Sequence, residues 1–189
     1  RSSGQGGSST SFTNFYTGGG KFVIKGGSTS GADAVAFNYG TKVFANGGQI
    51  AVDGLNTSSG LAIQIERGAG PVSEFFSSSN SAPAISFNAN SGSGYGFVSA
   101  YNQSTANSVY IQATGTGGIT IDGAGGAQDL FDIGLNGTNL LSAGTITLNN
   151  TSTGWSGGLF TGALASNTSS ASSVIGFCST ATCPASRIT

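Results

Sequence analysis

The carboxylates are the main candidates for catalytic side chains in this sequence, because the chain contains no histidine. Without an imidazole, a Ser-His-Asp or Cys-His nucleophile has no base to take its proton. Glu66 and Glu74 could form the carboxylate pair of a carbohydrate-active enzyme if the fold brought them together. Glu66 fits the end of a strand, however, and Asp favours turns by bonding its own backbone. The sequence therefore predicts a protein that is not an enzyme, with polysaccharide cleavage as a third hypothesis.

A later group of carboxylates, Asp122, Asp129 and Asp132, surrounds the glycine-rich residues 123–126. Calcium prefers oxygen ligands, and these three aspartates are the candidate calcium ligands of the chain. The alternative interpretation is a turn followed by a strand at residues 130–133. No other cofactor is expected, since two cysteines without histidine do not complete a zinc site.

The only two cysteines are Cys178 and Cys183, in a Ser/Thr-rich segment near the C-terminus. Two thiols so close together in such a segment predict a local disulfide and an exported protein. The loop is short, so the bond would hold the C-terminal tail rather than the whole fold. The chain also lacks methionine, which removal of a signal peptide or excision from a larger chain would explain. We expect an extracellular or cell-surface location.

Several Asn-x-Ser/Thr motifs occur, as expected by chance in a chain so rich in these residues. Asn56 and Asn136 lie at predicted turns, and they are the candidate glycosylation sites.

The composition excludes some classes of partner. About half of the 189 residues are Gly, Ser, Thr or Asn, and six basic and seven acidic residues give a net charge of −1. The basic residues are scattered, so no patch could neutralise the phosphates of a nucleic acid. The longest apolar runs, such as Phe22–Ile24, are too short to span a membrane. Copies of the same chain are the expected partners.

The hydrophobic pattern predicts an all-β fold. Short β-prone runs recur along the chain with Gly, Asn or Ser clusters between them. Ile63-Gln64-Ile65 and Thr145-Ile146-Thr147-Leu148 alternate apolar and polar residues, as half-buried strands do. No stretch of helical length lacks a helix-breaking residue.

Three segments share a glycine entry, an alternating strand and an Asp or Asn exit. They are residues 47–54, 117–123 and 144–150. These segments resemble the rungs of surface-exposed parallel β-helix proteins of the autotransporter passenger and filamentous haemagglutinin type. The resemblance implies a parallel β-solenoid. A β-sandwich or jelly-roll, as in a pilin-like subunit, is the alternative, because no strict repeat period runs through the chain.

The composition divides the chain into three parts. Residues 1–20 are rich in Gly and Ser and are predicted to form a flexible or assembly arm. Residues 21–177 hold the strands of a single β domain, and residues 178–189 form the tail with the disulfide. The arm has three aromatic residues outside the expected core, which a neighbouring subunit could cover. These predicted anchors are Phe12, Phe15 and Tyr16.

Together these features predict a structural subunit of an extracellular filament or surface layer. Such a homopolymer would assemble through the arm and through strand edges, with Phe22–Ile24 and Val174–Phe177 as the terminal strands. Near-zero net charge offers little repulsion against self-association. The alternative is an adhesin stalk or a tail-fibre-like module that binds surface glycans.

Overall fold

The protein is a parallel β-solenoid built from three sheets. The computed structural model describes residues 13–38, 40–66, 72–101, 109–125, 133–135, 137–150, 159–160 and 174–177. Sheet A consists of β1 (Thr13–Tyr16), β4 (Thr41–Ala45), β7 (Ser73–Ser77), β10 (Val109–Ala113), β13 (Thr138–Ser142) and β16 (Val174–Phe177). Sheet B consists of β2 (Phe22–Ser28), β5 (Ile50–Asn56), β8 (Ile85–Ser91), β11 (Ile119–Ala124) and β14 (Ile146–Asn150). Sheet C consists of β3 (Val35–Phe37), β6 (Ile63–Glu66), β9 (Phe97–Tyr101), β12 (Ile133–Leu135) and β15 (Leu159–Phe160).

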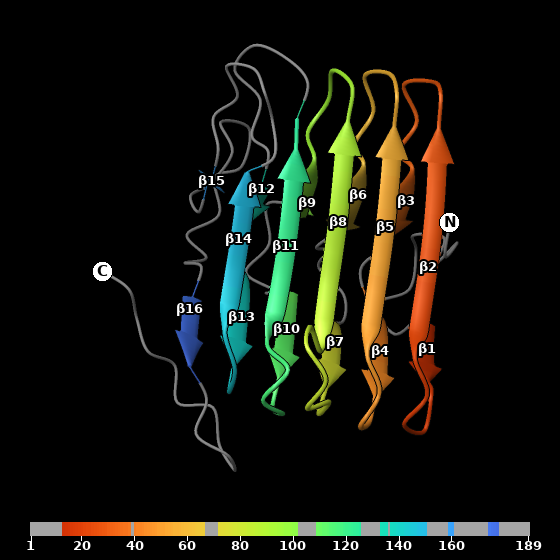
Figure 1. Ribbon diagram of the computed structural model, residues 1–189. Helices are drawn as coiled ribbons and strands as arrows, with labels where there is room; N and C mark the ends of the chain where they lie inside the picture. Colours follow the sequence, from red (N-terminus) through yellow and green to blue (C-terminus); the bar gives the residue numbers. More distant parts are fainter. Residues whose placement is uncertain are drawn as a thin grey trace.

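Each coil of the chain contributes one strand to each sheet in turn, so consecutive coils stack. The first coil is β1, β2 and β3, and the second is β4, β5 and β6. The strands of sheet B lie side by side and point the same way (Figure 1). Every strand pair in the described chain is parallel, with equivalent residues of adjacent coils in register. The predicted solenoid is therefore confirmed, and the sandwich alternative is excluded.

The glycines that begin the segments 47–54, 117–123 and 144–150 lie at the corner before sheet B. Gly47 and Gly118 have φ of 74° and 76°, in the left-handed region that favours glycine. Gly48 has a different reason to lack a side chain, because a Cβ there would lie 2.1 Å from the carbonyl oxygen of Gly20 in the coil below. All three segments belong to one sheet, where they form β5, β11 and β14 with their entry corners.

The core is the space enclosed by the three sheets. Inward-facing residues of sheet B form rows across the coils, such as Ile50, Ile85 and Ile119, which are fully or almost fully buried. In the third coil, one ring from each sheet fills the interior: Phe75, Phe87 and Phe97. The ring centroids of Phe75 and Phe87 are 5.4 Å apart and those of Phe87 and Phe97 5.0 Å apart. These rings supply much of the apolar area in a chain poor in large aliphatic residues.

A row of polar residues ends sheet B and satisfies the corner that follows. Ser28, Asn56 and Ser91 occupy equivalent positions in consecutive coils. The hydroxyls of Ser28 and Ser91 donate to the carbonyl oxygens of Ala32 and Gly60, at 2.7 and 2.9 Å. These bonds satisfy backbone carbonyls at the corners beside the sheet, one at exposed Ala32 and one at buried Gly60.

The predicted arm differs from the structure at its C-terminal side. Thr13–Tyr16 forms β1, which pairs in parallel with β4, so the boundary predicted at residue 20 falls inside the first coil. Phe15 is the one apolar side chain that β1 turns inward, and it packs on the core. Residues 1–12 and the predicted tail at 178–189 lie outside the described residues.

Candidate functional site

The N-terminal end of the solenoid is the candidate functional site. There β1, β2 and β3 are the outermost strands of sheets A, B and C. Each pairs with the second coil on one side, and within the described residues no strand pairs with the other side. The first coil thus ends in three strand edges that have backbone groups available for pairing.

Hydrogen bonds on β2 show which backbone groups face the edge. The N–H of Phe22 donates to the carbonyl oxygen of Gln49 at 2.8 Å, toward the second coil. Successive backbone groups of a strand point to opposite sides, so the N–H of Val23 points away from β5. The side chain of Val23 faces outward and is 49% exposed.

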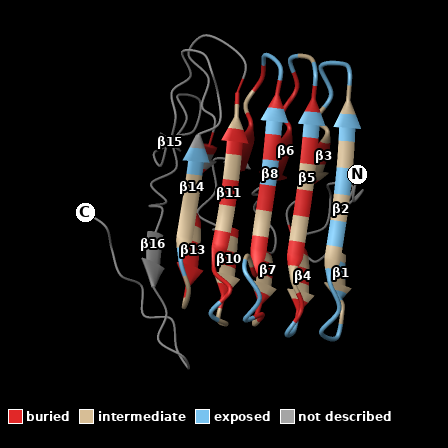
Figure 2. Ribbon diagram, in the orientation of Figure 1, coloured by how far each residue is buried: buried red, intermediate tan, exposed pale blue. Residues whose placement is uncertain are grey.

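The inner side chains at this end are less buried than their equivalents inside the stack. Phe22 and Ile24 are partly exposed, whereas their register partners Ile50 and Val52 are completely buried. Buried residues run along β5, β8 and β11, but β2 has none (Figure 2). The difference arises because no described coil covers the first one.

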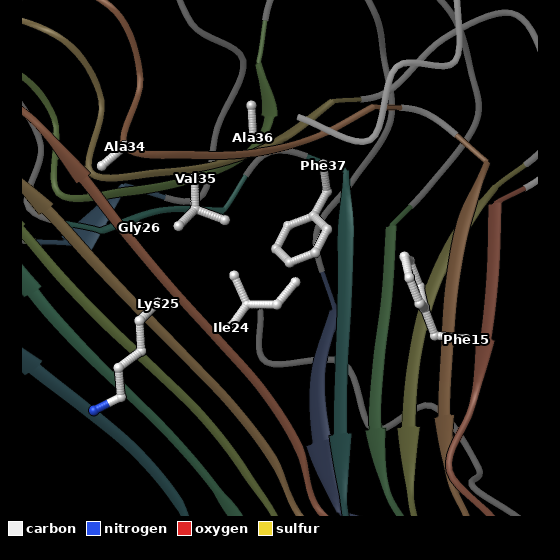
Figure 3. Close-up of a pocket in the computed structure, with 8 residues that line it drawn as sticks. All are labelled: Phe15, Ile24, Lys25, Gly26, Ala34, Val35, Ala36 and Phe37. Atoms are coloured by element: carbon white, nitrogen blue, oxygen red, sulfur yellow. The ribbon is translucent and has the colours of Figure 1, made fainter.

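A hollow of about 310 Å³ opens at this end of the core. Phe15, Ile24, Val35 and Phe37 line it, one or two from each sheet, and Ile24, Val35 and Phe37 point toward one another (Figure 3). Phe15 also packs on Phe22 with ring centroids 5.3 Å apart. The hollow therefore presents the apolar cross-section of the solenoid.

A row of aromatic side chains runs along the outer face of sheet A. Tyr16, Phe44 and Phe76 are equivalent residues of the first three coils. The rings of Tyr16 and Phe44 stack with centroids 5.3 Å apart and planes at 8°, and Phe76 follows at 6.1 Å. Tyr16 ends this stack and is 67% exposed. The predicted anchor is thus part of the first coil, with one ring face packed on Phe44.

Among the described residues, two ion pairs join neighbouring coils. Lys42 and Glu74 on sheet A are 3.1 Å apart with side chains 23% and 29% exposed, and Lys25 and Asp53 on sheet B are 3.3 Å apart and more exposed. Glu66 ends β6 on sheet C, so Glu66 and Glu74 lie on different sheets of the solenoid.

The outer face of sheet B carries a polar row in register: Lys25, Asp53, Asn88, Asp122 and Asn149. The amide of Asn149 donates to the carboxylate of Asp122 at 2.5 Å. Asp129 and Asp132, the other candidate calcium ligands, lie outside the described residues. Within the described ranges, no group of three or more His, Cys, Asp or Glu is placed to hold a metal ion.

Comparisons of the chain with protein-family models, curated proteins and solved structures found no match. The resemblance to autotransporter passengers and filamentous haemagglutinin therefore stays a prediction. Several other predicted sites lie outside the described residues: Phe12, Asn136, Cys178 and Cys183. The described part of the chain contains no helix with the length and apolarity needed to cross a bilayer.

Asn56, a candidate glycosylation site, has a structural role. Its side chain is buried, and its amide nitrogen donates to the carbonyl oxygens of Ala32 at 2.7 Å and Leu61 at 3.4 Å. Its side-chain oxygen accepts the N–H of Ser58 at 2.8 Å. A glycan on this nitrogen would have to displace the bonds that hold the corner, so the motif has a structural explanation in the folded chain.

Proposed function

We propose that the protein is a non-catalytic structural subunit that associates end to end through its first coil. The observation that carries this proposal is that, at one end, β1, β2 and β3 have edges with which no described strand pairs, beside partly exposed core side chains. A second copy that adds a strand to these edges would satisfy backbone groups and bury the hollow at the same time.

The two ends of sheet B support a head-to-tail arrangement. The inward row that begins at Phe22 ends at Ile146, and the row that begins at Ile24 ends at Leu148. Ile146 and Leu148 are partly buried, like the residues at the other end of their rows. A second copy that continues sheet B with its β2 beside β14 would keep the residue class of both rows, and its β1 would take the place beside β13 that β16 holds in the single chain. Exposed Tyr16 would gain a neighbour in the same way.

We place this assembly outside the cell, as a filament or surface layer. The composition supports this location, since the chain is nearly uncharged and rich in small polar residues. A net charge of −1 opposes the approach of further copies only weakly.

The test removes one backbone donor from the free edge. Val23→Pro deletes an N–H that makes no bond within β2–β5 pairing, so the fold should persist while strand addition is blocked. Val23→Thr keeps the N–H and the branched side chain and is the matched control. We expect fibres or long oligomers from the natural chain and the control in negative-stain electron microscopy and sedimentation, and dispersed particles from Val23→Pro with an unchanged circular dichroism spectrum.

A second variant covers the case in which proline disturbs the strand. Ile24→Lys places an ammonium group at the hollow, where a stacked copy would have to bury it without a partner. It too should stay dispersed. Natural chain that remains monomeric at high concentration, or assembly of both variants as efficiently as the natural chain, would overturn the proposal.

A further inference from the structure

A second hollow lies at the corner between sheets B and C, away from the core. Three successive corner loops stack there: residues 29–34, 57–62 and 92–96. The hollow measures about 330 Å³, and we call it the corner pocket. Its polar lining includes Asp33 from the first coil, Ser59 and Gln64 from the second, and Tyr95 from the third. The pocket is within the size range of small-molecule sites, at the lower end.

Gln64 is the residue that marks this pocket as a binding site. It is on the outer face of β6, between the inward-facing Ile63 and Ile65, yet its side chain is only 6% exposed. Its amide has no hydrogen-bond partner among the described residues, although it carries two donors and one acceptor. A buried polar group without a partner costs about 1–3 kcal/mol, so such groups call for an explanation. A polar ligand that enters the pocket would supply the missing partner.

Asp33 provides a second fixed polar group. One carboxylate oxygen accepts the N–H of Leu61 at 3.0 Å, which holds the side chain across the first two coils. A carboxylate accepts more than one hydrogen bond, so the other oxygen can accept from a ligand. The hydroxyl of Ser59 adds a group that both donates and accepts.

The spacing of the coils gives the pocket its width. Adjacent strands of a sheet are about 4.8 Å apart, so groups two coils apart are separated by roughly 10 Å. Asp33 and Tyr95 are two coils apart at equivalent corners. The equivalent residue of the second coil is Leu61, which also lines the pocket, so the lining spans three coils.

Glycines keep the wall of the pocket free of side chains. A Cβ on Gly94 would lie 2.2 Å from the carbonyl oxygen of Gly60, and a Cβ on Gly60 would lie 2.5 Å from that of Ala32. The stacking of the corners therefore requires glycine at these positions. The same requirement leaves backbone, rather than side chains, beside the ligand.

From these groups we propose that the corner pocket binds a neutral saccharide. Among the described residues, the lining contains a carboxylate and no Lys or Arg, which disfavours anionic ligands. An amide, a hydroxyl and a carboxylate oxygen together need a ligand that both donates and accepts, as sugar hydroxyls do. Tyr95 adds an aromatic side chain to the lining, and aromatic rings suit the C–H face of a sugar. This site is independent of the end-to-end assembly.

Ligand-observed saturation-transfer NMR tests the proposal with glucose, galactose, mannose, N-acetylglucosamine, cellobiose and lactose as probes at millimolar concentration. We expect at least one of them to bind the natural chain. Gln64→Leu should lower its affinity at least tenfold, and Asp33→Asn, which keeps an acceptor for Leu61, should lower it less. Gln112→Leu on the outer face of sheet A is the matched control and should bind as the natural chain does.

Stability provides a second readout. Since the amide of Gln64 lacks a partner among the described residues, Gln64→Leu should melt at the same temperature as the natural chain or a higher one. Absence of binding by all six sugars would overturn the proposal, and so would equal affinity of Gln64→Leu and the natural chain. A large fall in melting temperature for Gln64→Leu would also overturn it, because the amide would then be bonded within the chain. Assembly of the natural chain is measured in a separate experiment. A failure to assemble would therefore not decide whether the corner pocket binds a sugar.

Discussion

Phe75 and Phe76 are adjacent residues of β7 that face opposite sides of sheet A, and replacing each by alanine tests the solenoid directly. Phe75 is completely buried and packs edge-on against Phe37 at 5.0 Å and Phe87 at 5.4 Å. Truncation of a buried Phe costs about 3–5 kcal/mol. Phe76 is half-buried on the outer face, where its one described ring neighbour is Phe44 at 6.1 Å. Its loss should cost about 1 kcal/mol.

Urea unfolding followed by far-ultraviolet circular dichroism measures the difference. With a slope of about 2 kcal/mol per M, Phe75→Ala should lower the midpoint by about 2 M and Phe76→Ala by about 0.5 M. The dependence of the unfolding free energy on urea concentration must be the same for both variants. A different slope would indicate that the stacked coils unfold in parts and that the midpoints are not comparable. Equal midpoints for the two variants, or a lower midpoint for Phe76→Ala, would refute the assignment of inner and outer faces.

Two further matched pairs probe the corners by thermal unfolding. Gly26→Ala should lower the melting temperature by about 4–8 °C, corresponding to about 2 kcal/mol, because its Cβ would lie 2.2 Å from the carbonyl oxygen of Ala34. Gly27→Ala should leave it unchanged, since nothing lies within 4 Å of that Cβ, and similar losses for both would contradict the close approach. Asn56→Ala should cost about 2–3 kcal/mol by leaving buried corner groups unpaired. The exposed Asn88→Ala should cost less than about 0.5 kcal/mol, and a larger loss there than at Asn56 would be inconsistent with the polar corner row.

Most strands of this fold could be predicted from local patterns, because each one turns alternate apolar residues inward. The predicted strand at Val174–Phe177 coincides with β16, and the alternating run Ile63–Ile65 lies within β6. β1 was missed, since Phe15 is its one inward apolar residue and glycines follow it closely. Its pairing with β4, a tertiary contact, makes it a strand.

The coil period could not be predicted, because the corners differ in length. Phe22 pairs with Ile50, 28 positions later, and Ile50 pairs with Ile85, 35 positions later. Ile119 pairs with Ile146 after 27 positions. The inner rows stay in register while the loops absorb the difference, so the sequence lacks a fixed repeat.

The candidate sites could not be predicted from the sequence for the same reason. The stack of Tyr16, Phe44 and Phe76 joins residues 28 and 32 positions apart, which no local pattern connects. Gln64 alternates with two isoleucines and was expected on a solvent-exposed face, but the structure buries it. Its burial depends on neighbouring coils and corners, which a single strand pattern does not contain.

The parallel direction of the strands determines how a polymer of this protein would grow. Because each sheet is parallel, the two ends of the solenoid are different surfaces. A junction that preserves parallel pairing joins unlike ends, and such contacts are heterologous and do not close on themselves. The polymer would then have a polarity and no fixed subunit number. A chain defective only at its β2 edge could still add by its other end and stop further addition, so a small fraction of Val23→Pro mixed into natural protein should shorten the fibres.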